Sequence, residues 1–166
     1  MRGSSGFFAS NFLGLGGAQT PIFSAQQYDD ILVVDDSDTA LKFMQSRLAR
    51  YGFRAELVKT GEEALARLAT GTFKFVILDV ATEGLDGYQT CRAVKQLKYI
   101  SSKPPVVVML TNRGGSADKI RGGLAGCDAY LTKPLIEAEL LKVLSKYDEQ
   151  VERSFRDTNL GGSETP

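Results

Sequence analysis

Polar residues that could do chemistry follow four apolar runs of this chain. The pair Asp35 and Asp36 comes directly after "ILVV", and Asp79 closes "FVILD". Thr111 follows "VVVML", and Lys133 follows "YLT". If these runs are parallel strands, the groups at their carboxyl ends meet at one edge of a sheet. We therefore expect these five side chains to lie close together.

The types of these residues favour metal-assisted phosphoryl chemistry. Three carboxylates at one place repel one another, and burying them without a partner is costly. A cation removes that cost, and a small cluster of hard oxygen ligands suits Mg²⁺, which keeps room for water and a phosphoryl oxygen. The ammonium group of Lys133 and the hydroxyl of Thr111 suit contact with a phosphoryl group. Asp79, alone on its strand, is then the natural nucleophile and would form an acyl phosphate.

Composition excludes several other kinds of protein. The chain of 166 residues contains no histidine, which rules out a histidine-based triad or a histidine general base. Its 20 basic residues balance its 20 acidic ones, so nothing favours nucleic acid or an anionic membrane as a partner. No apolar run approaches the roughly 20 residues that span a bilayer. Cys91 and Cys127 match no zinc or redox spacing, and we interpret them as reduced thiols, which favours a cytoplasmic location.

The elements that must position these residues alternate between strands and helices. Five short apolar runs are separated by amphipathic segments, the pattern of an α/β fold with a doubly wound parallel sheet. Three of the runs are nearly unbroken Val, Ile and Leu, as expected for central strands covered on both faces. The predicted strands are Ile31–Val34, Arg54–Val58, Phe73–Val80, Pro105–Leu110 and Ala129–Thr132.

Caps and breakers place the first two helices. We expect Asp38 to cap a helix that ends near Gly52. Thr60 and Glu63 have the spacing of a capping box at the start of the second helix, and Gly71 should end it.

Three more helices and two tails complete the predicted organisation. A third helix runs from about Gly87 to Lys98, and a fifth should carry Pro134 in its first turn. The fourth, within "GGSADKIRGGLAGC", contains Gly122 and Gly123, each of which costs about 1 kcal/mol relative to alanine. We expect a leader and linker over residues 1–28, one domain over residues 29–147 and a polar tail over residues 148–166.

With these residues and spacings, residues 29–147 resemble the receiver domain of bacterial two-component response regulators. Asp79 lies 44 residues after Asp35, and Lys133 lies 22 residues after Thr111, as in that family. The resemblance implies a flavodoxin-like (βα)5 fold with strand order 2-1-3-4-5. It also implies a signalling switch rather than an enzyme, with Mg²⁺-dependent phosphorylation and dephosphorylation of the chain itself as its only reactions.

The resemblance also assigns roles at the site. Asp35, Asp36 and Asp79 would hold Mg²⁺ together with the backbone carbonyl of Ala81. Asp79 would accept the phosphoryl group, and Lys133 would contact it.

Two further features of the family carry over to this chain. Thr111 and Tyr130 would be the switch residues, which move when Asp79 is phosphorylated. The bond between Lys133 and Pro134 would be cis.

Partners follow from the same resemblance. A histidine kinase or a phosphotransfer protein would donate the phosphoryl group, since the chain has no histidine of its own. A protein effector would bind the face formed by the fourth helix, the fifth strand and the fifth helix, and a dimer could form on phosphorylation.

The sequence departs from the family near the phosphorylated aspartate. Thr82 and Glu83 stand where the family usually has other residues, and Asn112 and Arg113 follow Thr111. These four positions leave the lifetime of the phosphate open.

Two alternative functions remain. A haloacid-dehalogenase-type phosphatase would use Asp36 and Asp38, but Ala40 stands where its motif has Thr or Val. A pseudo-receiver would bind partners without phosphorylation, but the five functional positions are all intact.

Overall fold

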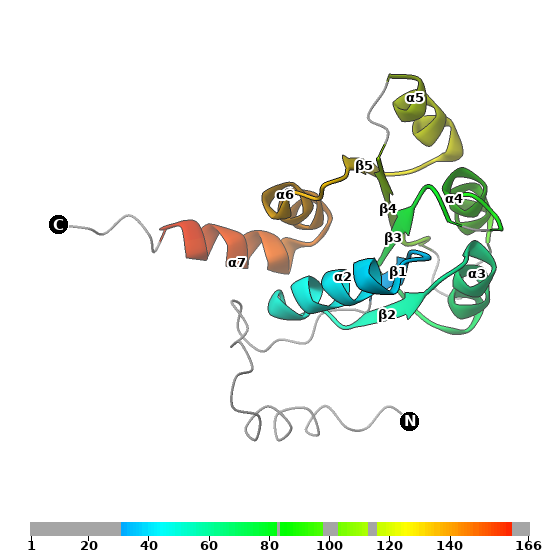
Figure 1. Ribbon diagram of the computed structural model, residues 1–166. Coiled ribbons are helices and arrows are strands. Elements are labelled where there is room, and N and C mark those ends of the chain that lie inside the picture. Colours follow the sequence, from blue (N-terminus) through cyan, green and yellow to red (C-terminus); the bar gives the residue numbers. More distant parts are fainter. Residues whose placement is uncertain (1–30, 83, 98–102, 113–115, 161–166) are drawn as a thin grey trace.

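The chain folds into a five-stranded parallel sheet with helices on both faces (Figure 1). The computed structural model describes residues 31–82, 84–97, 103–112 and 116–160. The strand order β2-β1-β3-β4-β5 confirms the predicted doubly wound, flavodoxin-like arrangement. The strands are β1 (Ile31–Val34), β2 (Ala55–Val58), β3 (Phe75–Asp79), β4 (Val106–Thr111) and β5 (Ala129–Thr132).

Six helices surround the sheet within the described part of the chain. They are α2 (Asp38–Arg50), α3 (Gly61–Thr70), α4 (Gly87–Gln96), α5 (Ser116–Ala125), α6 (Glu137–Tyr147) and α7 (Glu149–Leu160). None of them is both long and apolar enough to cross a membrane.

The strands bury side chains on both faces because their successive residues point in opposite directions. In β1, Ile31 and Val33 join the hydrophobic cluster beneath α2 and α6. Leu32 and Val34 join the cluster beneath α3, α4 and the end of α5. This two-sided burial accounts for the nearly unbroken apolar runs in the sequence.

Two predicted helix starts are wrong. Ser37, not Asp38, is the N-cap of α2: its backbone is extended and its Oγ accepts a hydrogen bond from the Ala40 N–H at 3.3 Å. Pro134 lies before α6, not in its first turn, because the cis bond between Lys133 and Pro134 belongs to the connection from β5 and the helix begins at Glu137. The cis bond itself agrees with the expectation from the family.

The predicted capping box of α3 is only half present. The Oγ1 of Thr60 accepts from the Glu63 N–H at 3.1 Å, but the Glu63 carboxylate accepts from the Lys59 N–H instead of that of Thr60. A complete capping box lies at the start of α4, between Asp86 and Gln89, where none was predicted.

The segment predicted as a polar tail contains α7. Asp148 caps this helix, since its Oδ1 accepts from the N–H groups of Gln150 and Val151 at 2.9 and 3.3 Å. Its Oδ2 lies 2.8 Å from the Nζ of Lys74, which precedes β3. Val151 is fully buried against the cluster beneath α2 and α6. The buried Val151 and the buried cap Asp148 therefore help to attach a mostly polar helix to the domain.

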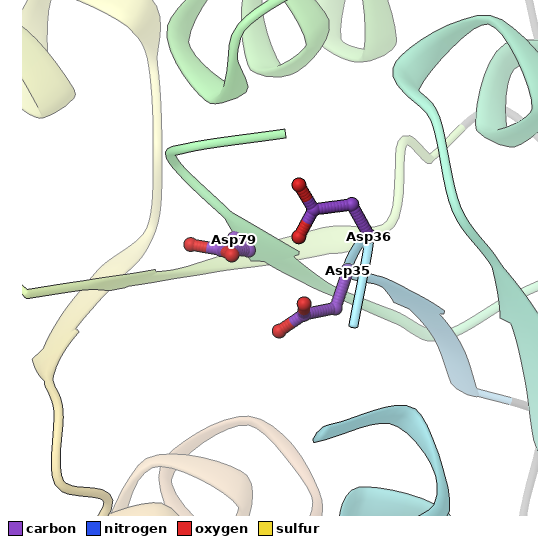
Figure 2. A group of neighbouring side chains, drawn as sticks. All are labelled: Asp35, Asp36 and Asp79. Atoms are coloured by element: carbon purple, nitrogen blue, oxygen red, sulfur yellow. The ribbon is translucent and has the colours of Figure 1, made fainter. Parts of the chain in front are cut away.

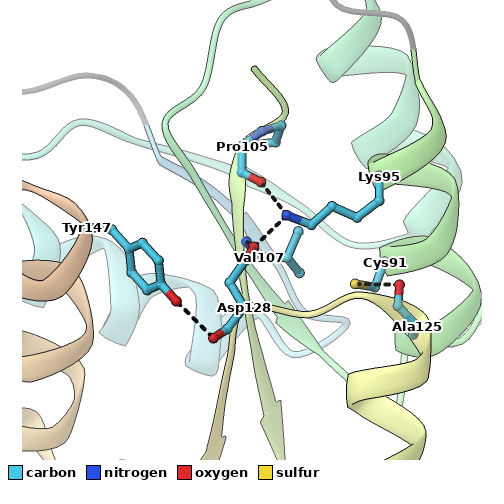
Figure 3. A network of polar contacts seen from close by, with 7 residues as sticks. All are labelled: Cys91, Lys95, Pro105, Val107, Ala125, Asp128 and Tyr147. Carbon is cyan, nitrogen blue, oxygen red and sulfur yellow. Dashed lines mark hydrogen bonds and ion pairs between the residues drawn. The ribbon is translucent and has the colours of Figure 1, made fainter. Parts of the chain in front are cut away.

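A polar network ties together the amino ends of β4 and β5 (Figure 3). The Oδ2 of Asp128 accepts from the Val107 N–H at 2.8 Å and from the Nζ of Lys95 at 2.5 Å. Lys95 also donates to the Pro105 carbonyl at 3.1 Å, and the Tyr147 hydroxyl donates to the Asp128 carbonyl at 3.1 Å. This network joins α4, β4, β5 and α6 at the edge of the sheet opposite the carboxylates.

Candidate metal and phosphoryl site

Three carboxylates gather at the carboxyl ends of β1 and β3 (Figure 2). One carboxylate oxygen from each of Asp35, Asp36 and Asp79 lies within 4.8 Å of the others. The parallel register brings them together, because Val34 of β1 is paired with Leu78 of β3, one residue before Asp35 and Asp79. Asp35 and Asp79 are buried, and Asp36 is exposed.

Backbone N–H groups orient the two buried carboxylates. The Oδ1 of Asp35 accepts from the Ser37 N–H at 2.9 Å, and the Oδ1 of Asp79 accepts from the Ala81 N–H at 3.2 Å. In each residue the second oxygen, Oδ2, is left to face Lys133.

Lys133 bridges the two buried carboxylates. Its Nζ lies 3.3 Å from the Oδ2 of Asp35 and 3.3 Å from the Oδ2 of Asp79. Burial lowers the pKa of Lys133, but the charges of Asp79 and Asp35 and the hydrogen bonds to both outweigh burial, so the pKa lies above its usual value. Lys133 therefore carries its full positive charge at neutral pH.

The charges and donor atoms of this cluster fit Mg²⁺. Three carboxylates and one ammonium leave two negative charges uncompensated among these four groups. The carboxylate oxygens are hard ligands, the kind that Mg²⁺ prefers. The exposed carboxylate of Asp36 leaves an open side on which water or a phosphoryl oxygen could complete the coordination. The role of the Ala81 carbonyl as a ligand stays a prediction, although its residue lies at the site through its N–H.

Thr111 lies beside this cluster at the end of β4. It is buried, and it comes one residue after Leu110, which is paired with Asp79 across the sheet. The Lys133 N–H donates to the Thr111 carbonyl at 2.8 Å, so the backbones that carry these two residues are directly joined.

Tyr130 lies apart from the carboxylates, within β5 and opposite Met109. Its side chain is partly buried, and its hydroxyl lies 3.3 Å from that of Tyr88 in the first turn of α4. No motif in the sequence singled out Tyr88 as a neighbour of Tyr130.

Gly87 shapes the loop that follows Asp79. Its N–H donates to the Val80 carbonyl at 3.0 Å, and a Cβ at this position would lie 2.6 Å from the Val80 Cα and 2.9 Å from the Asp79 carbonyl oxygen. Only glycine allows the chain to return this close to the end of β3. The pair "DG" before a helix was the signal for this turn in the sequence.

The structure describes two of the four residues that depart from the family pattern. Thr82 is buried and its Oγ1 donates to the Leu85 carbonyl at 3.1 Å, which closes the loop after Asp79. Asn112 is exposed at the end of β4. Glu83 and Arg113 lie outside the described residues.

Asp38 does not join the cluster. Its Oδ1 lies 2.9 Å from the Nζ of Lys59, and both side chains are exposed. A haloacid-dehalogenase-type site would need Asp36 and Asp38 together, so the geometry disagrees with the phosphatase alternative.

Comparisons with known sequences agree with this geometry. The family model of the response regulator receiver domain matches residues 31–145. The chain is 34% identical over 117 residues to protein PilG of Pseudomonas aeruginosa, a match that covers 70% of this chain and 85% of PilG. It is 32% identical over 133 residues to the heme response regulator HssR of Staphylococcus epidermidis, covering 78% of this chain and 57% of HssR. The chain thus matches only about half the length of HssR.

Solved structures share this fold over about three quarters of the chain. A putative response regulator from Chloroflexus aurantiacus superposes with a TM-score of 0.67 at 32% identity, over 73% of this chain and 98% of that one. The chemotaxis response regulator CheY4 of Vibrio cholerae superposes with a TM-score of 0.66 at 28% identity, over 74% of this chain and 100% of CheY4. Fold, site geometry and family match agree, and the chain belongs to the response regulator receiver domain family of two-component signalling.

Proposed function

We propose that Asp79 accepts a phosphoryl group from a phosphohistidine of a histidine kinase or phosphotransfer protein. The observation that carries this proposal is the Asp79 carboxylate: it is buried, joined to the Ala81 N–H through one oxygen, and within 3.3 Å of the Lys133 ammonium through the other. An oriented carboxylate beside a cation and two further acids suits nucleophilic attack on phosphorus.

The reaction is an in-line transfer between two nucleophiles. A carboxylate oxygen of Asp79 forms a bond to phosphorus while the bond from the donor imidazole nitrogen breaks, and the nitrogen keeps the electron pair. Lys133 stabilises the charge on the transferred group. Mg²⁺ held by Asp35, Asp36 and Asp79 would supply neutralisation of the phosphoryl oxygens.

The output is a change in protein contacts. Thr111 and Tyr130 are the proposed switch residues, and the surface they would alter is formed by α5, β5 and α6. On α5, the side chains of Ile120 and Leu124 are 64% and 78% exposed, which supports a protein effector or a second, phosphorylated copy as the partner there. The free thiols Cys91 and Cys127 support a cytoplasmic location.

The direct test is phosphorylation of the chain itself. With Mg²⁺ and acetyl phosphate, intact-mass measurement should show one added phosphoryl group in the native chain and none in Asp79→Asn. A chain that stays unmodified while its fold is intact would support the pseudo-receiver alternative. Analytical ultracentrifugation of the same samples tests the proposed phosphorylation-dependent dimer.

A further inference from the structure

The Tyr130 side chain lies in a slot formed by α4 and α5. Its hydroxyl is 3.3 Å from the Tyr88 hydroxyl, at a distance where either group could donate a hydrogen bond to the other. Tyr88 is buried, and the Tyr130 ring packs against the same hydrophobic cluster.

Gly122 of α5 makes room for the ring. A Cβ at this position would lie 3.0 Å from Cδ2 and 3.1 Å from Cε2 of Tyr130, and 3.1 Å from the Sγ of Cys127. At the next residue, Gly123, a Cβ would meet no atom within 4 Å. The two adjacent glycines therefore differ: a Cβ at Gly122 would press on Tyr130 and Cys127, and a Cβ at Gly123 would press on nothing.

On the α4 side of the slot, Tyr88 and the N-cap of α4 contact a charged side chain of α5. The guanidinium carbon of Arg121 lies 4.3 Å from the centre of the Tyr88 ring, and its Nη2 lies 3.5 Å from the Oδ2 of Asp86, the N-cap of α4. These contacts join α5 to the first turn of α4 beside Tyr88.

We propose that Tyr88 is a positioning residue for the switch. Its hydroxyl, with the space left at Gly122, holds the Tyr130 ring in its inward position. This inference rests on the proposed function, in which Tyr130 moves when Asp79 is phosphorylated. The inward position is the one seen here, between α4 and α5, and we take it as the position that phosphorylation favours. Because coupling between two sites is reciprocal, a group that stabilises inward Tyr130 also strengthens binding of a phosphoryl group at Asp79.

Hydroxyl removal tests the contact without removing either ring. In Tyr88→Phe, the beryllofluoride concentration that half-saturates the Mg²⁺-loaded chain, followed through the Tyr130 amide signal in NMR spectra, should rise about fivefold, the effect of one neutral hydrogen bond. Tyr130→Phe should give a similar rise. In the double variant the half-saturating concentration should also be about fivefold above that of the native chain, whereas two independent effects would multiply to about 25-fold.

Multiplied effects in the double variant, or no effect of Tyr88→Phe, would overturn the proposal. The two single variants keep both aromatic rings, so the hydrophobic cluster stays filled.

The adjacent glycines supply a matched pair of variants. Both Gly122→Ala and Gly123→Ala favour the helix by the same intrinsic propensity. Gly122→Ala should displace the Tyr130 ring, which shifts its ring-proton signals and raises the half-saturating beryllofluoride concentration at least fivefold. Gly123→Ala should change neither the ring-proton signals nor the half-saturating concentration. Equal behaviour of the two variants would contradict the slot.

The free protein separates this inference from the proposed function. Without any phosphoryl analogue, Tyr88→Phe and Gly122→Ala should each shift the Tyr130 ring-proton signals, and unchanged signals would overturn the slot. A native chain in which beryllofluoride has no effect would overturn the proposed function, whatever these shifts show.

Discussion

At the scale of single residues, Asp36 adds a third negative charge to a pair that already shares Lys133. Since a ligand that binds only the folded state stabilises it, Mg²⁺ should raise the free energy of unfolding of the native chain, by about 2.7 kcal/mol at 100 times its dissociation constant. Asp36→Asn should remove most of this gain. Without Mg²⁺, the same variant should be at least as stable as the native chain, because it relieves repulsion.

The control for this prediction lies two residues further along. Asp38→Asn removes an exposed carboxylate that pairs with Lys59 outside the cluster, so the Mg²⁺ effect should be retained. Urea unfolding with and without Mg²⁺ measures both variants. Equal loss of the Mg²⁺ effect in both would place the metal elsewhere.

The buried thiol of Cys91 predicts a pH dependence of stability. Burial, and to a smaller extent the neighbouring Cys127, raises the pKa of Cys91 to about 12. In the unfolded chain the thiol ionises at about pH 8.5, so its contribution to stability is complete below that pH and is lost as the pH rises toward 12. Cys91→Ala should therefore flatten the decline in the free energy of unfolding between about pH 8.5 and 10. Parallel curves for the two chains would contradict this assignment.

At the scale of elements, the strands were the most predictable part of the fold. β1, β3 and β4 are buried on both faces. Both faces therefore need apolar side chains, and the resulting apolar runs allow these strands to be located in the sequence. Because parallel strands carry their functional groups at one edge, the site residues Asp35, Asp79 and Thr111 followed from the strands alone.

Helix starts were less predictable because neighbouring residues compete for the cap. In "DDSDTA", both Ser37 and Asp38 are good caps, and the choice is made by Asp35, whose carboxylate accepts the Ser37 N–H and holds that residue extended. The contact between Tyr88 and Tyr130 joins residues 42 positions apart, and no local pattern in the sequence reveals it.

Helix α7 was not predicted from the sequence, because it is mostly polar and Asp148 and Val151 contact residues that are distant in the chain. Asp148→Ala removes the cap of α7 and leaves Lys74 without its buried carboxylate. We expect the free energy of unfolding to fall by about 1–3 kcal/mol. Glu149→Ala, which removes only an exposed pair with Arg153, should change it by less than about 0.5 kcal/mol. Urea unfolding followed by circular dichroism compares them, and equal losses would show that α7 is not anchored through Asp148.

At the scale of the whole molecule, the two edges of the sheet have different tasks. The carboxyl edge gathers three carboxylates whose charges repel one another, and it is the proposed site for Mg²⁺ and the phosphoryl group. The amino edge is fully paired around Asp128, whose carboxylate joins Lys95 to the buried N–H of Val107 (Figure 3). The contacts of Asp128 therefore hold β5 at its amino end, away from the proposed site, while its carboxyl end leads to Lys133.

This division predicts that the amino edge affects stability without affecting the site. Asp128→Ala should lower the free energy of unfolding by about 2 kcal/mol, because it leaves the Val107 N–H without its acceptor. Asp128→Asn keeps an oxygen acceptor and loses mainly the partly exposed pair with Lys95, so its cost should be about 1 kcal/mol or less. In both variants the half-saturating beryllofluoride concentration should match that of the native chain. A rise as large as that expected for Tyr88→Phe would show that the two edges are coupled through β5, and that the anchored end takes part in the switch.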